Sequence, residues 1–293
     1  MNHSSNDTSV VDTSLPLSFS ATFSVLGIVV FIVNIFTFGV IIHFKQLREN
    51  HAILIGSLSV ADALTGLSVI AAAVLSYQIT DICSIYSNWF ETCLNVWILV
   101  SQWHTVSLSI DRLIAVKYAL TYHTIMTPHR LRILIVVTWV VGCVEATLLG
   151  LWFIPDACIR LGYDGYSTSY FYQGHISVIF VINALVYTYL WRTARFLRGQ
   201  IGGQEQAVQH SPTSPQNPQH KIDKATVIVI AIVGLYGMLW LPTIVCRIAI
   251  EFTSDELRRR LSDVNEYLNM LGFVNSVVNC LVYGSTIKNK LRR

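Results

Sequence analysis

The sequence predicts an all-α membrane protein in which seven helices cross the bilayer. It has 293 residues, of which 53% are hydrophobic and only 13% are charged. This composition is too apolar for a soluble domain and is typical of membrane proteins. A helix that spans a bilayer needs about 20 consecutive apolar residues, and seven stretches of the chain meet or approach that length. Within them only Asp62 and Glu145 are charged.

The seven predicted spans follow one another along the chain. The first follows a polar tail, the second carries Asp62 near its middle, and the third stops just before the charged pair Asp111 and Arg112. The fourth contains Glu145, the fifth is uncharged, and the sixth contains Pro242, a residue type that removes one backbone hydrogen bond and kinks a helix. In order, the predicted spans are residues 21–42, 52–77, 93–110, 133–155, 174–191, 225–246 and 267–287.

The domain organisation predicted from these spans is one bundle without a soluble domain or an internal repeat. The bundle covers residues 21–287, between an N-terminal tail of residues 1–20 and a short tail of residues 288–293. Residues 199–220 are rich in Gly, Gln, Pro and Ser and cannot bury enough apolar surface to order themselves. They are predicted to form a flexible cytoplasmic loop.

Charge predicts the orientation of the bundle. Most of the 20 Lys and Arg residues fall in the connections after the first, third, fifth and seventh spans, and cytoplasmic connections collect positive charge. The N-terminus is therefore expected outside a plasma membrane, with the first span acting as an uncleaved signal anchor. Asn2 and Asn6 begin glycan acceptor triplets on that outer tail. The net charge of +3 hides a basic inner and an acidic outer end, and nucleic acid is not an expected partner.

Asp62 is the most informative single residue, because a charged group in the middle of the bilayer is costly and marks a functional site by default. It needs oxygen or amide partners at its own depth. Two interpretations remain open from the residues alone: a Na⁺ site built from oxygen ligands, or a hydrogen-bonded network that only holds helices together. The expected partners are Asn34, Ser101, Asn275, Ser276 and Asn279.

Six short motifs, in order on successive spans, resemble those of the rhodopsin-like (class A) G-protein-coupled receptors. The resemblance covers roughly residues 20–293 and implies an extracellular ligand, a heterotrimeric G protein as partner, no cofactor, and a short amphipathic C-terminal helix. It also implies that Asp62, Ser101, Asn275, Ser276 and Asn279 form an allosteric Na⁺ site. The motifs are Asn34, Leu58-Ser59-Val60-Ala61-Asp62, Asp111-Arg112-Leu113, Trp139, Leu239-Trp240-Leu241-Pro242 and Asn279-Cys280-Leu281-Val282-Tyr283.

By the same resemblance, Arg112 faces the G protein and pairs with Asp111 when the bundle is closed. Trp240, with Tyr236 one turn below and Pro242 beyond, is expected to be the switch under the ligand pocket, and Tyr283 to stabilise the active state. Asn34 and Trp139 are expected to be structural. Leu113 replaces the family's usual Tyr, a tolerated variation. Two other departures remove hinges: Cys280 replaces a Pro, and the fifth span has no Pro. Asp223 lies near, not at, the position of an acidic partner for Arg112, so raised basal signalling is predicted.

The cysteines divide into two groups. Cys143, Cys246 and Cys280 lie within apolar spans and are expected to be inert packing residues. For the outer disulfide that the family usually carries, the pairing of Cys83 with Cys158 is preferred, with Cys93–Cys158 and the absence of a bridge as alternatives.

The sequence excludes two classes of ligand but does not identify the ligand itself. Leu94 stands where monoamine receptors carry an Asp, and the seventh span has no Lys for retinal, so neither ligand is expected. Residues 120–127 are similar to melanocortin receptors and residues 275–279 to adenosine receptors, which leaves the subfamily open. The candidate ligand contacts are Asn95, Trp97, His175, Arg247, Glu251 and Asn269.

Other classes of membrane protein fit less well. An intramembrane protease would need a second central Asp or a Ser–His pair, so an enzyme is not expected. Transporters usually show repeats with broken helices, and none is apparent. The alternatives retained are a non-signalling or constitutively active seven-helix protein, or a transporter. The short C-terminal tail has few hydroxyl groups, which predicts weak arrestin coupling.

Overall fold

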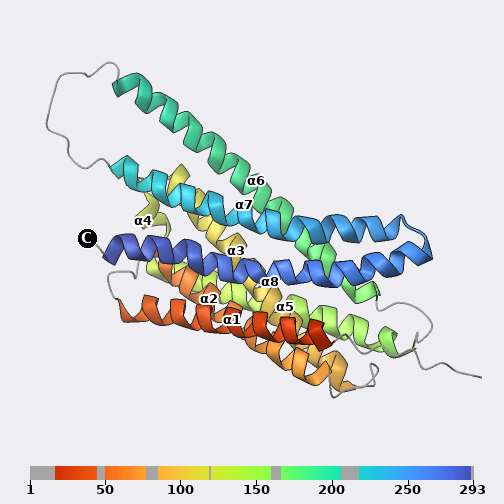
Figure 1. Ribbon diagram of the computed structural model, residues 1–293. Helices are drawn as coiled ribbons and strands as arrows, with labels where there is room; N and C mark the ends of the chain where they lie inside the picture. Colours follow the sequence, from red (N-terminus) through yellow and green to blue (C-terminus); the bar gives the residue numbers. More distant parts are fainter. Residues whose placement is uncertain are drawn as a thin grey trace, which may run out of the picture.

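The computed structural model describes residues 17–44, 50–118, 120–159, 166–205 and 218–291, apart from residues 77–84. It consists of seven long helices and one single-turn helix (Figure 1). Apolar stretches of this length form helices because hydrocarbon offers no partner to backbone N–H and C=O groups. The helices are α1 (Leu17–His43), α2 (Asn50–Ser76), α3 (Ile85–Lys117), α4 (Tyr122–Ile125), α5 (Pro128–Ile159), α6 (Tyr166–Glu205), α7 (Pro218–Glu251) and α8 (Asp255–Leu291).

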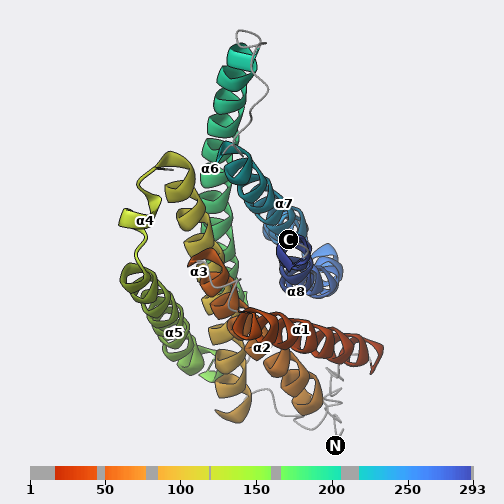
Figure 2. The same cartoon turned by 90° about the vertical axis from the view of Figure 1, so that its left-hand side faces the viewer.

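The long helices form one bundle with α3 in its middle (Figures 1 and 2). Helix α3 packs against α2, α5, α6 and α7, and also contacts the short α4. Helix α1 packs against α2 and α8, and α7 packs between α6 and α8. Side chains that point inward from α3 therefore meet groups from most of the other helices.

Glycines allow two of these helix pairs to approach closely. A Cβ atom added to Gly66 of α2 would lie 2.8 Å from the carbonyl oxygen of Gly27 on α1. A Cβ atom added to Gly142 of α5 would lie 2.8 Å from the Cα atom of Val100 on α3. Small residues at such crossings are typical of membrane helices, where close backbone packing replaces the hydrophobic effect as the driving force.

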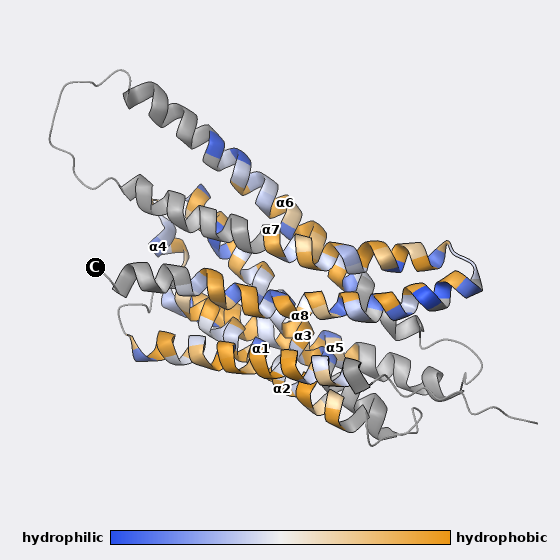
Figure 3. Ribbon diagram, in the orientation of Figure 1, coloured by the Kyte–Doolittle hydropathy of each residue, from blue (hydrophilic) through white to orange (hydrophobic). Residues whose placement is uncertain are grey.

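Apolar residues occupy most of the described length of α1 (Figure 3). Across the bundle, many large apolar side chains are exposed, while a set of polar side chains is buried beside the apolar core. Exposed valines recur every fourth residue on α5, at Val136, Val140 and Val144, and Leu148 continues this stripe. Asp62, Gln102 and many hydroxyl and amide side chains are buried instead. A large exposed apolar surface marks contact with a membrane or partner, and here the stripes face the predicted lipid.

Five of the long helices contain a stretch apolar enough to cross a membrane within the described residues: Ser20–His43, His51–Ala71, Pro128–Leu148, Gly174–Thr193 and Gly234–Glu251. Helices α3 and α8 do not meet that measure because they carry many of the polar residues that point into the bundle. The seven-helix bundle is confirmed.

Two boundaries differ from the sequence prediction. Helix α6 continues to Glu205 and α7 begins at Pro218, so residues 199–205 and 218–220 are helical although 199–220 was expected to be a loop. Once a helix is nucleated, each further residue adds one hydrogen bond at little cost. Similarly, α8 runs without a break to Leu291, so the expected short C-terminal helix is continuous with the seventh span.

Candidate functional site

Asp62 lies at the centre of a buried polar cluster formed by α2, α3 and α8. Its Oδ1 atom accepts a hydrogen bond from the Ser101 hydroxyl on α3 and another, at 2.9 Å, from the Ser276 hydroxyl on α8. The carboxylate is fully buried. The structure therefore brings together three of the five predicted sodium-site residues by direct hydrogen bonds.

The remaining polar atoms of this cluster have spare hydrogen-bonding capacity. Within the described part of the chain, Asp62 Oδ2, Asn275 Oδ1 and both amide atoms of Asn279 have no hydrogen-bond partner. Buried polar groups usually have a protein or water partner, so these atoms are available to bind a small molecule or an ion.

Asn34 is not a direct partner of Asp62, contrary to the sequence prediction. Its amide nitrogen donates to the carbonyl oxygens of Val30 at 2.9 Å and of Ser276 at 3.4 Å, and its Oδ1 accepts from the Cys280 thiol at 3.0 Å. Asn34 thus joins α1 to α8 beside the Asp62 cluster. Cys280 is a hydrogen-bond donor in this position, not only the inert packing residue expected from the sequence.

A small cavity adjoins Asp62 and extends toward α7. Its volume is about 20 Å³, enough for one water molecule or one small ion. Besides Asp62 and the two serines, its lining includes Gln102 of α3, Tyr236 of α7 and Asn275 of α8. Oxygen atoms predominate among the unpartnered groups in this lining, which suits a hard cation such as Na⁺.

Trp240 closes the cavity on the α7 side and packs against the backbone of α8. Its indole ring is buried with Tyr236, Ile179 and other apolar side chains, and the Tyr236 and Trp240 rings lie 6.3 Å apart. A Cβ atom added to Gly272 would lie 2.5 Å from Cζ2 of Trp240, so only glycine leaves room for the ring. Pro242 lies within α7, two residues beyond Trp240.

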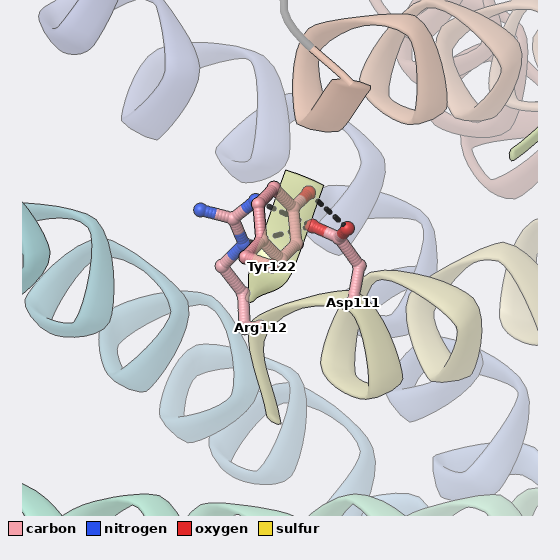
Figure 4. A network of polar contacts seen from close by, with 3 residues as sticks. All are labelled: Asp111, Arg112 and Tyr122. Atoms are coloured by element: carbon pink, nitrogen blue, oxygen red, sulfur yellow. Dashed lines mark hydrogen bonds and ion pairs between the residues drawn. The ribbon is translucent and has the colours of Figure 1, made fainter. Parts of the chain in front are cut away.

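At the other end of α3, Asp111 and Arg112 form an ion pair that Tyr122 of α4 completes (Figure 4). Arg112 donates to Asp111 Oδ2 from Nε at 2.9 Å and from Nη2 at 2.5 Å, and the Tyr122 hydroxyl donates to Oδ1 at 2.7 Å. Asp111 is fully buried and Arg112 nearly so. Tyr283 lies in the apolar cluster between α2 and α8, where its hydroxyl has no described partner.

Trp139 belongs to a hydrogen-bonded chain that joins α5, α2 and α3. Its indole N–H donates to Ser57 Oγ at 3.0 Å, and Ser57 lies 2.8 Å from His104 Nε2. His104 Nδ1 lies 2.8 Å from the Val100 carbonyl oxygen, an atom that only accepts. His104 therefore carries its proton on Nδ1 and accepts the Ser57 hydroxyl on Nε2. Every group in this chain is satisfied, as expected of a structural residue.

Glu145, the second charged residue in the spans, joins three helices. Its Oε2 accepts from the Trp103 indole of α3 at 2.7 Å, and its Oε1 lies 2.5 Å from His175 Nδ1 of α6. Sequence analysis did not assign Glu145, Trp103 or Gln102 a role. For Glu145 the signal was present, because an intramembrane carboxylate needs a named partner. For Gln102, the signal that could have indicated a role was an uncharged amide side chain within a predominantly apolar predicted span.

The candidate ligand contacts do not gather into one described pocket. Trp97 packs edge-on against Trp139 and His175 hydrogen-bonds Glu145, so both serve helix packing. Arg247 is buried, Glu251 is exposed, and Asn95 and Asn269 are partly buried. Asn2, Asn6 and Cys83, and the side chains of Cys93 and Cys158, lie outside the described residues. Cys143, Cys246 and Cys280 are free thiols.

Comparison with known proteins agrees with this arrangement. Melanocortin receptor 4 of Danio rerio is 32% identical over 134 residues, covering 43% of this chain and 41% of that protein. The 5-hydroxytryptamine receptor 1A-alpha of Takifugu rubripes is 31% identical over 167 residues, covering 52% and 38%. Trace amine-associated receptor 13c of Danio rerio is 26% identical over 295 residues, covering 92% and 80%. The first two matches thus span about two fifths of those relatives' lengths.

The predicted similarity to melanocortin receptors is confirmed by these relatives. A family match extends much further along the chain: residues 33–283 match the family described as 7 transmembrane receptor (rhodopsin family). That range includes the Asp62 cluster, the Asp111–Arg112 pair and Trp240. The chain therefore belongs to the rhodopsin family of seven-transmembrane receptors.

Proposed function

We propose that this receptor transmits an extracellular ligand signal to heterotrimeric G proteins through an outward movement of α7, the sixth long helix. The observation that carries the proposal is the Asp111–Arg112–Tyr122 network (Figure 4). Arg112 is nearly buried and tied to an acid of its own helix, so its guanidinium becomes available only when that pair opens. A buried ion pair with two discrete arrangements is a two-state element of the kind that switches use.

Helix α7 is suited to move relative to α3. Pro242 removes one backbone hydrogen bond and permits a bend, while Trp240 anchors the segment before it against Gly272. Among the described side chains, Arg112 forms an ion pair with Asp111 and with no acid of α7. Asp223, the nearest acid expected on α7, has a side chain outside the described set. We propose that α7 is weakly restrained at this end and that basal signalling is raised.

The Asp62 cluster is proposed to hold a sodium ion that favours the inactive arrangement. The fit rests on the unpartnered Asp62 Oδ2 and Asn275 Oδ1 atoms and on the adjoining cavity. Asp62, Ser101, Ser276 and the amides of Asn275 and Asn279 would provide its oxygen ligands or line its site. A bound sodium ion supplies the positive charge that a carboxylate in hydrocarbon lacks. Ser101 and Ser276 already orient the carboxylate from two different helices.

The ligand is proposed to enter from the N-terminal side, with the receptor in the plasma membrane. Two of the relatives are named for amines. Amines are therefore the first ligands to test, because binding of one would contradict the sequence-based prediction. Leu94 provides no carboxylate at the position where monoamine receptors carry one, so we propose that a simple monoamine is not the ligand.

The experiment is second-messenger profiling of wild type and Arg112→Ala in cells, without ligand and against a ligand library, at matched surface expression. Arg132→Ala is the matched control, because Arg132 is exposed just beyond α4 and donates only to a backbone carbonyl of its own helix. We expect Arg112→Ala to lose ligand-independent signalling that wild type and Arg132→Ala retain. Equal signalling by all three proteins would refute the role assigned to Arg112.

A further inference from the structure

Gln102 is a buried amide next to the proposed sodium site. The motif positions from which that site was assigned do not include it. It follows Ser101 on α3, is 3% exposed, and lines the same cavity as Asp62. Neither its Oε1 nor its Nε2 atom has a hydrogen-bond partner among the described residues. A buried amide left without partners is destabilising, so an occupant of the cavity is expected to satisfy its oxygen.

The other unpartnered groups of the cavity come from three further helices. They are Asp62 Oδ2 on α2, the Tyr236 hydroxyl on α7 and Asn275 Oδ1 on α8. The cavity of about 20 Å³ has room for one body of the size of a water molecule. A single occupant must therefore serve groups from several helices at once. With a carboxylate and two amide oxygens among these groups, the lining favours a small cation over a neutral molecule.

We propose that Gln102 is an additional ligand of the cation site, so that the site extends from Asp62 toward Tyr236 and Trp240. This inference rests on the sodium site of the proposed function and adds a residue to it. Gln102 contributes its amide oxygen to the occupant, while its side chain lies in the cavity that Trp240 closes. Occupancy at Asp62 is then linked by one side chain to the aromatic pair on α7.

The stability of a Gln102 variant with and without sodium distinguishes a cation ligand from a packing residue. If its amide has no partner without the cation, an apolar residue of similar size removes an unsatisfied group and stabilises the sodium-free protein. In sodium the same substitution removes a ligand. Gln102→Leu is therefore expected to raise the unfolding temperature in the absence of sodium and to weaken the stabilisation that sodium provides.

The test is thermal unfolding of the purified full chain in detergent, followed by tryptophan fluorescence. Sodium chloride replaces choline chloride stepwise at constant ionic strength. A ligand that binds only the folded state raises the unfolding temperature as its concentration passes its dissociation constant. We expect a sodium-dependent rise in wild type, no rise in Asp62→Asn, and in Gln102→Leu a rise that needs about tenfold more sodium, since hydrogen-bond-strength contacts to charged groups have this order of effect.

Two further variants complete the design. Thr188→Val is the matched control, because Thr188 is exposed on α6, away from the residues that line the cavity, and its hydroxyl donates to the Ala184 carbonyl; its sodium response should equal that of wild type. Gln102→Asn, which keeps the amide but shortens its reach by one methylene, replaces Gln102→Leu if that variant does not fold. It should show the same weakened response to sodium.

The outcomes distinguish this inference from the sodium site itself. If Asp62→Asn abolishes the sodium response and both Gln102 variants respond like wild type, Gln102 is not a ligand, although the site stands. If wild type shows no sodium-dependent rise, the sodium site and the role of Gln102 both fail. A weakened response in the Gln102 variants with an unchanged response in Thr188→Val supports the proposal.

Discussion

Glu145 offers the sharpest test of how this bundle is held together, since one side chain joins α3, α5 and α6. In Glu145→Ala, the Trp103 indole N–H and His175 Nδ1 lose the acceptors that lie at 2.7 and 2.5 Å. His175 is then left as a buried imidazole, with a side chain only 6% exposed.

The magnitude follows from the two contacts. Hydrogen bonds between helices in a membrane average about 0.6 kcal/mol and reach about 1.7, so two contribute about 1–3 kcal/mol. Leaving a buried donor unpaired adds a penalty of about 1–3 kcal/mol, which places the expected loss near the upper end, at about 2–3 kcal/mol. At about 2–4 °C per kcal/mol, the unfolding temperature should fall by about 4–12 °C.

The assay is thermal unfolding of the purified receptor. Trp103→Phe removes one of the two contacts and keeps most of the ring, so it should show about half the loss. Val144→Ala is the control, because Val144 is the preceding residue and faces the predicted lipid. Our account of this contact is untenable if Glu145→Ala and Val144→Ala unfold at the same temperature, within about 1 °C.

Two further substitutions test the switch region. Tyr122→Phe removes the hydroxyl that donates to Asp111 at 2.7 Å, a hydrogen bond of about 0.5–1.5 kcal/mol. We expect a few-fold rise in ligand-independent signalling. The control Tyr118→Phe, at a partly exposed neighbour, should match wild type. Gly272→Ala places a Cβ atom against the Trp240 ring and should destabilise the receptor by about 1–3 kcal/mol. Gly234→Ala, with nothing within 4 Å of its added Cβ atom, should instead stabilise α7 by up to about 1 kcal/mol. A stabilising Gly272→Ala, or unchanged basal signalling in Tyr122→Phe, would contradict these assignments.

The seven helices could be predicted from the sequence because the bilayer allows few alternatives. A stretch of about 20 apolar residues has only one way to satisfy its backbone in lipid, and each predicted span lies largely within a long helix. The expected partners of Asp62 could be found for a related reason. A carboxylate at that depth must meet polar groups at the same level, and Ser101 and Ser276 do donate to it.

Several other pairings between helices could not be predicted, because spacing along one helix does not determine how its neighbours are rotated. Sequence position alone could not place His175 opposite Glu145, and it suggested a ligand contact instead. Nor could it show that Cys280, where the family has a Pro, would donate to Asn34. Gln102 stands beside Ser101 in the sequence, yet only the packing of α7 and α8 around α3 shows that both line one cavity.

Among the described residues, the satisfied and unsatisfied polar groups are unevenly distributed over the bundle, and this distribution bears on how a switch operates. Between α2, α3 and α5, the Trp139–Ser57–His104 chain has a partner for every donor and acceptor. Fully satisfied buried networks rigidify a core, so these three helices form a fixed frame.

Unsatisfied groups gather instead where α7 and α8 meet α3. They include Tyr236, Tyr283 and Asn279 as well as Gln102, all buried within the described residues. An unpaired buried group gains free energy from any rearrangement that supplies a partner. Movement of α7 against the fixed frame can therefore be offset by new hydrogen bonds. Movement of α5 away from α3, or of α8 away from α2, would instead break existing ones. This asymmetry favours α7 as the moving element independently of the family resemblance, because it follows from which groups already have partners.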